Sequence, residues 1–188
     1  MADDPGITAG IGLKTRLAWL LTLAPVMFVL DYVTKRLVLE RMTPYGPTVE
    51  LIDNVARLRF IYNDGIVFGI SPAYLTGTTL AAFSVLVALV MTAYLLFARL
   101  DDRWSLAALC LVVGGAAGNL VDRIIWGRVI DFIEVGIGDL TWPVFNVADM
   151  AVTVGAVLLA WRLLFQSPGA HEQASVSDDA PGESGSSS

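Results

Sequence analysis

Four long apolar runs dominate this sequence and limit the folds open to it. They cover residues 17–37, 75–98, 104–121 and 143–165. As helices that rise about 1.5 Å per residue, such runs can cross a hydrocarbon layer roughly 30 Å thick. Only 16% of the residues are charged and 55% are hydrophobic, too few charges to cover the surface of a water-soluble domain. The runs therefore predict an all-α membrane protein built as a four-transmembrane-helix bundle, with Pro25 expected to break the first helix.

The segments outside the runs divide into two surface regions and a tail. Residues 48–62 alternate apolar and basic side chains, which predicts short strands at the membrane surface between the first two helices. Residues 126–142 form a second, shorter surface segment between the last two helices. Residues 1–166 are thus assigned to one membrane domain. Residues 167–188 are rich in Ser, Gly and acidic side chains and are expected to be a disordered tail.

Composition excludes several kinds of chemistry. The net charge of −6 comes largely from the termini, and nothing in the sequence favours a nucleic-acid partner. The single cysteine, Cys110, cannot form an intrachain disulfide and is expected to pack as a small buried hydrophobe. The single histidine, His171, lies in the polar tail, which argues against histidine-based catalysis and histidine-ligated metals. No metal or cofactor is expected.

Ionisable residues within membrane spans are costly and usually functional, so their placement is informative. Asp31 lies near the end of the first run, Asp122 at the end of the third and Asp149 near the start of the fourth. Because successive spans alternate in direction, these three positions share one face of the bilayer. Asp131 lies in the loop on that same face. Four carboxylates are therefore predicted to converge at one end of the bundle, where water can reach them.

Local spacing adds polar neighbours to these carboxylates. Asn146, Asp149 and Thr153 fall on one face of a fourth helix, for which Pro143 is a candidate start. At the end of the third run, Asp122 and Arg123 follow Asn119 by three and four residues and so share its helical face. Gly114 and Gly118 form a small-residue pair that lets a neighbouring helix approach.

Simpler interpretations exist for three of the four carboxylates. Asp31 and Lys35 have the spacing of an ordinary ion pair at a helix end, and Asp122 beside Arg123 is typical of a pair at the membrane interface. Asp131 on its own would be a solvated loop charge. Asp149 differs, because no basic residue lies within one helical turn of it, so that its partner must come from elsewhere in the fold.

Five sequence blocks stand out for their polar residues and glycines. They are Asp31-Tyr-Val-Thr-Lys35, Asn63-Asp-Gly-Ile-Val-Phe-Gly69, Gly114-Gly-Ala-Ala-Gly-Asn-Leu-Val-Asp-Arg123, Val129-Ile-Asp-Phe132 and Trp142-Pro-Val-Phe-Asn-Val-Ala-Asp149. In order and approximate spacing, these blocks resemble the lipoprotein signal peptidase family, also called signal peptidase II. The resemblance covers about residues 14–165, with a mild departure at residues 65–69, where alanines are commoner.

This resemblance implies an aspartic endopeptidase that removes signal peptides from bacterial prolipoproteins. The cut would fall on the N-terminal side of a cysteine that carries a diacylglyceryl group. Asp131 and Asp149 match the catalytic pair of the family. The positions that match residues lining or bracing the site are Asp31, Lys35, Asn63, Asn119, Asp122, Arg123 and Asn146.

The resemblance also implies a place in the cell. It predicts a multi-pass, monomeric protein of the bacterial inner membrane whose partners are its lipidated substrates and membrane lipid. Both termini and the acidic tail would be cytoplasmic, and the site and the β-rich segment would face the extracytoplasmic side. Basic residues number seven on the site side and five on the other, so charge counting does not give the orientation.

Two neighbouring carboxylates can share one proton, because both cannot ionise cheaply at close range. The ionised one would activate water and the protonated one would polarise the scissile carbonyl, but the sequence leaves open which of Asp131 and Asp149 is the base.

Three other functions have some support in the sequence. Gly136-Ile-Gly-Asp139 matches the short GxGD string of other intramembrane aspartyl proteases, but outside an apolar run. Asp31, Asp122 and Asp149 could act as proton relays in a small transporter, although no carboxylate continues the path across the membrane. A serine protease would need a nucleophile elbow and a usable histidine, which the sequence lacks; Ser71, Ser84 or Ser105 with Lys35 would be the only candidates.

Overall fold

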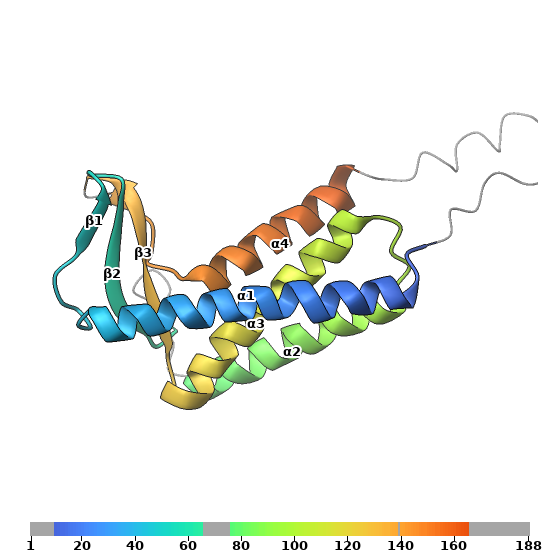
Figure 1. Cartoon of the computed structure of the whole chain (residues 1–188), viewed down its shortest axis with the longest axis horizontal. Coiled ribbons are helices and arrows are strands. Elements are labelled where there is room, and N and C mark those ends of the chain that lie inside the picture. Colours follow the sequence, from blue (N-terminus) through green and yellow to red (C-terminus); the bar gives the residue numbers. More distant parts are fainter. Residues whose placement is uncertain (1–9, 66–75, 139, 166–188) are drawn as a thin grey trace, which may run out of the picture.

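The computed structural model describes residues 10–65, 76–138 and 140–165. Its four helices are α1 (Leu13–Arg41), α2 (Gly77–Phe97), α3 (Arg103–Trp126) and α4 (Val147–Phe165), arranged side by side (Figure 1). Each is long and apolar enough to span a membrane, which confirms the four predicted spans. Three predicted features lie outside the described residues: the tail, Asp139 of the GxGD string, and residues 66–69 of the block that departs from the family pattern.

The first helix is longer than expected and is not broken. It runs through Pro25 without interruption, so the predicted break at this residue is wrong. Proline removes one helical hydrogen bond, and membrane helices tolerate it where neighbouring helices pack closely. Such packing is present here, because a Cβ atom added to Gly114 of α3 would lie 2.7 Å from the carbonyl oxygen of Ala24.

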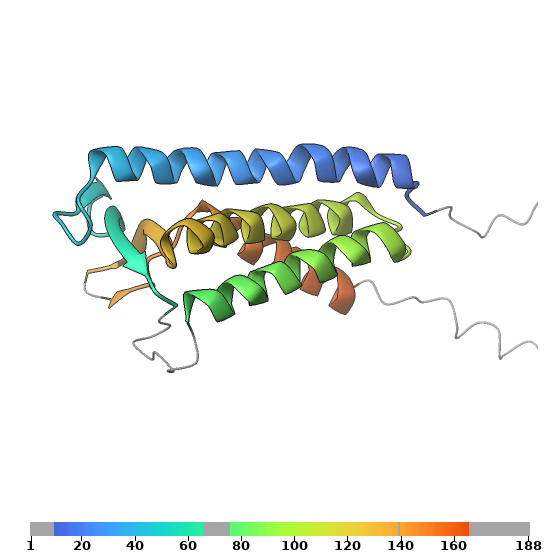
Figure 2. The same cartoon turned by 90° about the horizontal axis from the view of Figure 1, so that it is seen from below.

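Helix α3 is the centre of the bundle. It lies between α1 and α2 and also packs along α4 (Figures 1 and 2). The predicted small-residue pair faces α1, since a Cβ atom on Gly118 would lie 2.5 Å from Asp31 Oδ2. The other three helices expose apolar side chains along most of their length. This pattern of burial shows that α3 is the central helix and that α1, α2 and α4 face the lipid.

Helix α4 begins later than predicted. The expected start at Pro143 is wrong, because residues before Val147 are held against a strand instead. The backbone N–H of Phe145 donates to the Ile133 carbonyl at 2.9 Å, and the Ile133 N–H donates to the Phe145 carbonyl at 2.8 Å. These two bonds fix the approach to α4 in an extended conformation.

A four-stranded antiparallel sheet covers one end of the bundle. Its strands are β1 (Val49–Ile52), β2 (Ala56–Asn63), β3 (Val129–Ile137) and β4 (Leu140–Thr141), in that spatial order. The strands expected within residues 48–62 are confirmed. The β-rich region is not confined to the link between the first two helices, however, because the segment between α3 and α4 supplies the other two strands. This pairing covers an edge of β2 that would otherwise be unpaired.

Each end of the bundle has its own apolar core. Under the sheet, Val38 of α1 packs with Phe60, Ile130 and Phe132. At the opposite end, Leu95, Leu106 and Cys110 form part of a second cluster, which confirms that Cys110 is buried.

Buried Arg16 ties two helices together beside the second cluster. It donates to the Leu95 carbonyl at 3.1 Å and to the Ala98 carbonyl at 2.5 Å. These carbonyls lie at the C-terminal end of α2, where helix carbonyls lack partners within the helix and a cation is favourable.

Candidate active site

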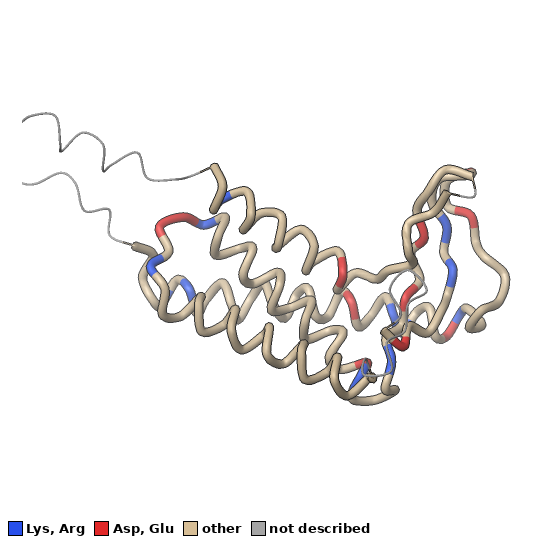
Figure 3. The backbone as a smooth tube through the Cα atoms, turned by 180° about the vertical axis from the view of Figure 1, so that it is seen from behind, with Lys and Arg blue, Asp and Glu red and all other residues tan. Residues whose placement is uncertain are grey.

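Strand β3 and helix α4 bring two aspartates to the same end of the bundle. Asp131 is fully buried on β3, opposite Ile61 of β2. Asp149 is half-buried in the first turn of α4. Figure 3 shows acidic positions gathered where the helices meet the sheet. The prediction that the carboxylates converge at one end is therefore confirmed, but the expected access of water to all four is wrong, because Asp31, Asp122 and Asp131 are buried.

Asn146 connects the two aspartates directly. Its Nδ2 donates to Asp131 Oδ1 at 2.7 Å, and its backbone N–H donates to Asp149 Oδ2 at 3.2 Å. In return, the Asp149 N–H donates to Asn146 Oδ1 at 2.9 Å. This reciprocal pair is a capping box at the start of α4. Asn146 therefore caps the helix, and its predicted place within the helix is wrong. Thr153 was expected to share a helical face with Asp149, but its side chain is exposed.

Two more asparagines hold the remaining carboxylate oxygens. Asn63, at the end of β2, donates to Asp131 Oδ2 at 2.8 Å. Asn119 of α3 donates to Asp149 Oδ1 at 2.7 Å. All four carboxylate oxygens thus accept a hydrogen bond from an uncharged N–H group. Among the described residues, no Lys or Arg side chain forms an ion pair with either carboxylate.

The environment of Asp131 favours its protonated form. Burial raises the pKa of Asp131 to about 7, and the neighbouring charge of Asp149 adds to the rise. Hydrogen bonds from Asn63 and Asn146 and the charge of Lys35 act on this pKa in the opposite direction. A carboxyl that titrates near neutral pH beside a second, more exposed carboxyl is suited to acid–base chemistry.

Beneath the aspartates, buried Lys35 joins two further carboxylates. Its Nζ lies 2.7 Å from Asp31 Oδ2 and 2.8 Å from Asp122 Oδ2, and it donates to Asn119 Oδ1 at 3.0 Å. Asp31 and Lys35 do form the ion pair of the simpler interpretation, but at 1% and 3% exposure it is internal rather than at the surface.

The same two carboxylates hold the elements that carry the aspartates. Asp31 Oδ1 accepts the N–H of Ala148, in the first turn of α4, at 2.8 Å. Asp122 Oδ2 accepts the N–H of Ile130 on β3 at 3.1 Å. Lys35, Asp31 and Asp122 therefore fix the backbone on either side of the site rather than the aspartates themselves.

Arg123 has a different neighbour from the one expected. Among the described residues it forms no ion pair, which makes the interface pairing with Asp122 wrong. Its Nη1 donates to Ser84 Oγ of α2 at 3.2 Å and to the Asn119 carbonyl at 3.4 Å. The guanidinium therefore lies beside the asparagine that holds Asp149, and its Nε and Nη2 donate to no residue in the part of the chain that the structure describes.

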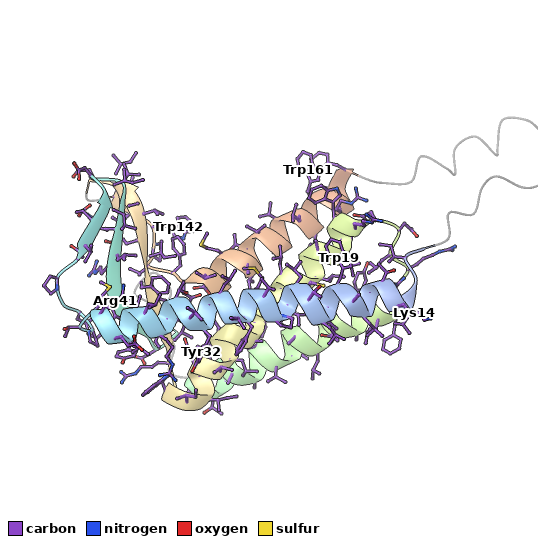
Figure 4. The ribbon with its side chains drawn as sticks, viewed as in Figure 1. Lys14, Trp19, Tyr32, Arg41, Trp142 and Trp161 are labelled. Carbon is purple, nitrogen blue, oxygen red and sulfur yellow. The ribbon has the colours of Figure 1, made fainter. Side chains whose placement is uncertain are left out.

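An apolar groove of about 460 Å³ opens beside Asp149. The segment that leads into α4 forms one wall and the first turns of α4 form the other. Trp142 lies on the side of the sheet that faces α4 (Figure 4). Asp149 is the only charged residue in the lining, which comprises Trp142, Pro143, Val144, Phe145, Asp149, Met150, Thr153 and Val154. Asp149 is thus reached from outside, whereas Asp131 is covered.

Sequence reasoning missed two features near the site. Ser84 had been considered only as a nucleophile, yet it accepts a hydrogen bond from Arg123. Glu134, almost fully buried on β3, pairs with Arg57 and Arg59 of β2. The two arginines are two residues apart and so share a face of their strand, a signal that calls for an acidic partner on the next strand. Within the described ranges, no three His, Cys, Asp or Glu residues gather as a metal site would require.

Comparison with known proteins gives a consistent picture. The family described as signal peptidase (SPase) II matches residues 23–165. A lipoprotein signal peptidase of Thermodesulfovibrio yellowstonii is 34% identical over 139 residues, which cover 74% of this chain and 90% of the relative. A lipoprotein signal peptidase of Janthinobacterium sp. is 37% identical, and the match covers 79% of this chain and 88% of the relative. One of Mycolicibacterium smegmatis is 39% identical, and the match spans 81% of this chain but only 63% of that longer relative.

Two solved structures of bacterial membrane enzymes share the fold. Both superpose with a TM-score of 0.70, at 23% and 25% sequence identity. The matches cover 94% and 86% of this chain and 99% of each solved chain.

Proposed function

Because this chain belongs to the signal peptidase II family, whose members remove signal peptides from prolipoproteins, we propose that Asp131 and Asp149 are its catalytic dyad. The observation that carries the proposal is the difference between the two carboxyls. Both are bound to Asn146, but one is buried and titrates near neutral pH, whereas the other faces a groove. Such a contrast separates an acid from a base.

The chemistry needs only these two groups and water. Asp149, reached from the groove, takes a proton from water as the water oxygen attacks the scissile carbonyl carbon. Asp131 begins protonated, donates to the carbonyl oxygen and stabilises the tetrahedral intermediate. The carbonyl then re-forms and the C–N bond breaks. The leaving amine receives the proton that Asp149 had taken, and Asp131 recovers the proton that it had donated.

Surrounding residues position the dyad and the substrate. Asn63, Asn119 and Asn146 orient the carboxylate oxygens, whereas Lys35, Asp31 and Asp122 hold the backbone of β3 and α4. Arg123 lies beside Asn119, has donors that no described residue accepts, and is suited to bind a substrate carbonyl.

The substrate is a diacylglyceryl-modified prolipoprotein, cut on the N-terminal side of the lipidated cysteine. An apolar groove that ends on Asp149 supports a substrate that approaches from the lipid. The protein acts as a monomer in the bacterial inner membrane, with both termini cytoplasmic and the dyad on the extracytoplasmic side.

The other functions are less well supported. Asp31, Asp122 and Asp149 belong to one compact network through Lys35 and Asn119, an arrangement that does not form a relay across the membrane. Ser84 accepts from an arginine and has no base beside it in the part of the chain that is described.

The test uses purified full-length chain and a prolipoprotein with and without its diacylglyceryl group. Asp131→Asn and Asp149→Asn should each abolish cleavage of the lipidated substrate, and wild type should not cleave the unmodified form. Asp53→Asn, at an exposed turn of the sheet, is the matched control. Asp139→Asn should also stay active. Near-normal cleavage by either dyad variant, or loss of cleavage in Asp139→Asn alone, would overturn the assignment.

A further inference from the structure

A second apolar groove lies on the other side of the sheet from the dyad. It has a volume of about 390 Å³ and lies between the C-terminal half of α1 and the strands. Its lining residues are Thr34, Leu37, Val38, Arg41, Met42, Val49, Leu58 and Phe132, none of which lines the groove at Asp149. Phe132 follows Asp131 on β3, and neighbouring strand residues point to opposite faces. This groove is therefore separate from the site of cleavage.

The chemistry of the lining is that of a site for an amphiphile. Six of the eight residues are apolar, and the Thr34 hydroxyl is already bonded to the carbonyls of Leu30 and Asp31. Arg41 is the one charged residue of the lining. Within the described part of the chain, its guanidinium has no hydrogen bond or ion pair. An exposed arginine without a counter-ion at the end of an apolar channel favours an anionic group.

The position of the groove fits the boundary of a bilayer. Helix α1 has 29 residues, about 43 Å, and so extends beyond a hydrocarbon layer roughly 30 Å thick. Leu37 faces outward with 41% of its surface exposed, and Arg41 follows one turn later in the last turn of the helix. Arg41 lies at the end of α1 beneath the strands (Figure 4). Along α1, apolar surface is followed by a cation. A phospholipid in the bilayer matches this order, because its acyl chains lie next to its phosphate.

We infer that this groove binds one anionic glycerophospholipid of the bilayer. An acyl chain lies against Leu37, Val49 and Leu58, and the phosphate accepts hydrogen bonds from Arg41. The bound lipid bridges α1 to the sheet. Because it binds the folded chain only, it also stabilises the fold.

Native mass spectrometry of the full chain in uncharged detergent tests this inference. Phosphatidylglycerol and phosphatidylcholine with identical acyl chains are titrated separately. Wild type should bind one phosphatidylglycerol in preference to phosphatidylcholine. Arg41→Gln should weaken that binding roughly tenfold, because it removes a charge-assisted contact. Val49→Trp, which fills the groove and keeps Arg41, should weaken it as well.

Three controls make the result decisive. Arg36→Gln removes the same charge from the same helix outside the groove and should bind as wild type does. Glycerol phosphate, which has no chains, should not compete. Asp149→Asn should bind lipid normally, so that a failure of this inference is distinct from a failure of the dyad. Equal binding of both lipids, unchanged binding in Arg41→Gln, or an equal loss in Arg36→Gln would overturn the inference.

Discussion

Asn146 and Asp149 cap each other at the start of α4, with the Asp149 N–H 2.9 Å from Asn146 Oδ1 and the Asn146 N–H 3.2 Å from Asp149 Oδ2. A single polar residue thereby sets both the beginning of the helix and the orientation of a carboxylate of the dyad. Asn146 also donates to Asp131, so that its amide joins the two elements of the site.

Replacing Asn146 by serine keeps the helix cap and removes the side-chain amide, which donates to Asp131, Asn119 and the Ile130 carbonyl. Serine keeps the N-cap acceptor but loses the donor. Since that donor lowers the pKa of Asp131, its loss should raise this pKa further, and the alkaline limb of the pH–activity profile should move to higher pH. Cleavage should fall about 100-fold through misplacement of the dyad. Thr76→Ser at the N-cap of α2 is the control, and an unmoved alkaline limb in Asn146→Ser would contradict the assignment.

The raised pKa of Asp131 predicts a fold that loses stability as pH rises. Folding favours the protonated carboxyl, so this contribution is full below about pH 4 and is lost as pH rises through about 7. The change from 3.8 to about 7 corresponds to roughly 4 kcal/mol. The fall in Tm between pH 5 and pH 8 should therefore be smaller in Asp131→Asn than in wild type, whereas Asp53→Asn should follow wild type. Parallel curves for all three proteins would show that Asp131 titrates normally.

Removal of the Lys35 charge should destabilise the bundle strongly. Lys35→Met leaves Asp31 and Asp122 buried without a counter-ion, and breaking such a pair costs about 3–5 kcal/mol. The triple variant Asp31→Asn, Lys35→Met, Asp122→Asn should recover most of the lost Tm, since each asparagine can still accept the backbone N–H that the aspartate holds. Lys14→Met, at an exposed position of α1, should leave Tm unchanged. A triple variant no more stable than Lys35→Met would contradict the charge explanation.

The proposed orientation can be tested with single cysteines in a Cys110→Ala background. Thr48→Cys, beside β1, should react with a membrane-impermeant thiol reagent added outside intact spheroplasts. Asp101→Cys, between α2 and α3, should react only after lysis. Both positions are exposed, so access to the reagent depends on the side of the membrane. Labelling of Asp101→Cys from outside would place the dyad at the cytoplasmic face.

The sequence predicted the convergence of carboxylates because alternating spans fix which ends share a face. That rule alone is enough to place Asp31, Asp122 and Asp149 at the same end of the bundle. The partner of Asp122 was not predictable in this way, because Lys35 lies on another helix and the contact depends on how α1 packs against α3. The pairing of β2 with β3 was missed for a similar reason, since their paired residues are more than 60 positions apart. The start of α4 is readable from Asn146-Val-Ala-Asp149, which has the spacing of a capping box. Pro143 is a misleading signal, because the residues after it bond to β3 before the helix begins.

The bonds around Asp131 have a consequence for how the enzyme is made. Its two oxygens are held by Asn63 from β2 and Asn146 from the segment before α4, and the strand that carries Asp131 follows α3. A chain emerging into the bilayer during synthesis cannot join these pieces until its last helix has entered. Under the proposed assignment of the dyad, a half-inserted molecule carries its carboxylates without the asparagine contacts that orient them, and we expect it to leave neighbouring polypeptides uncut.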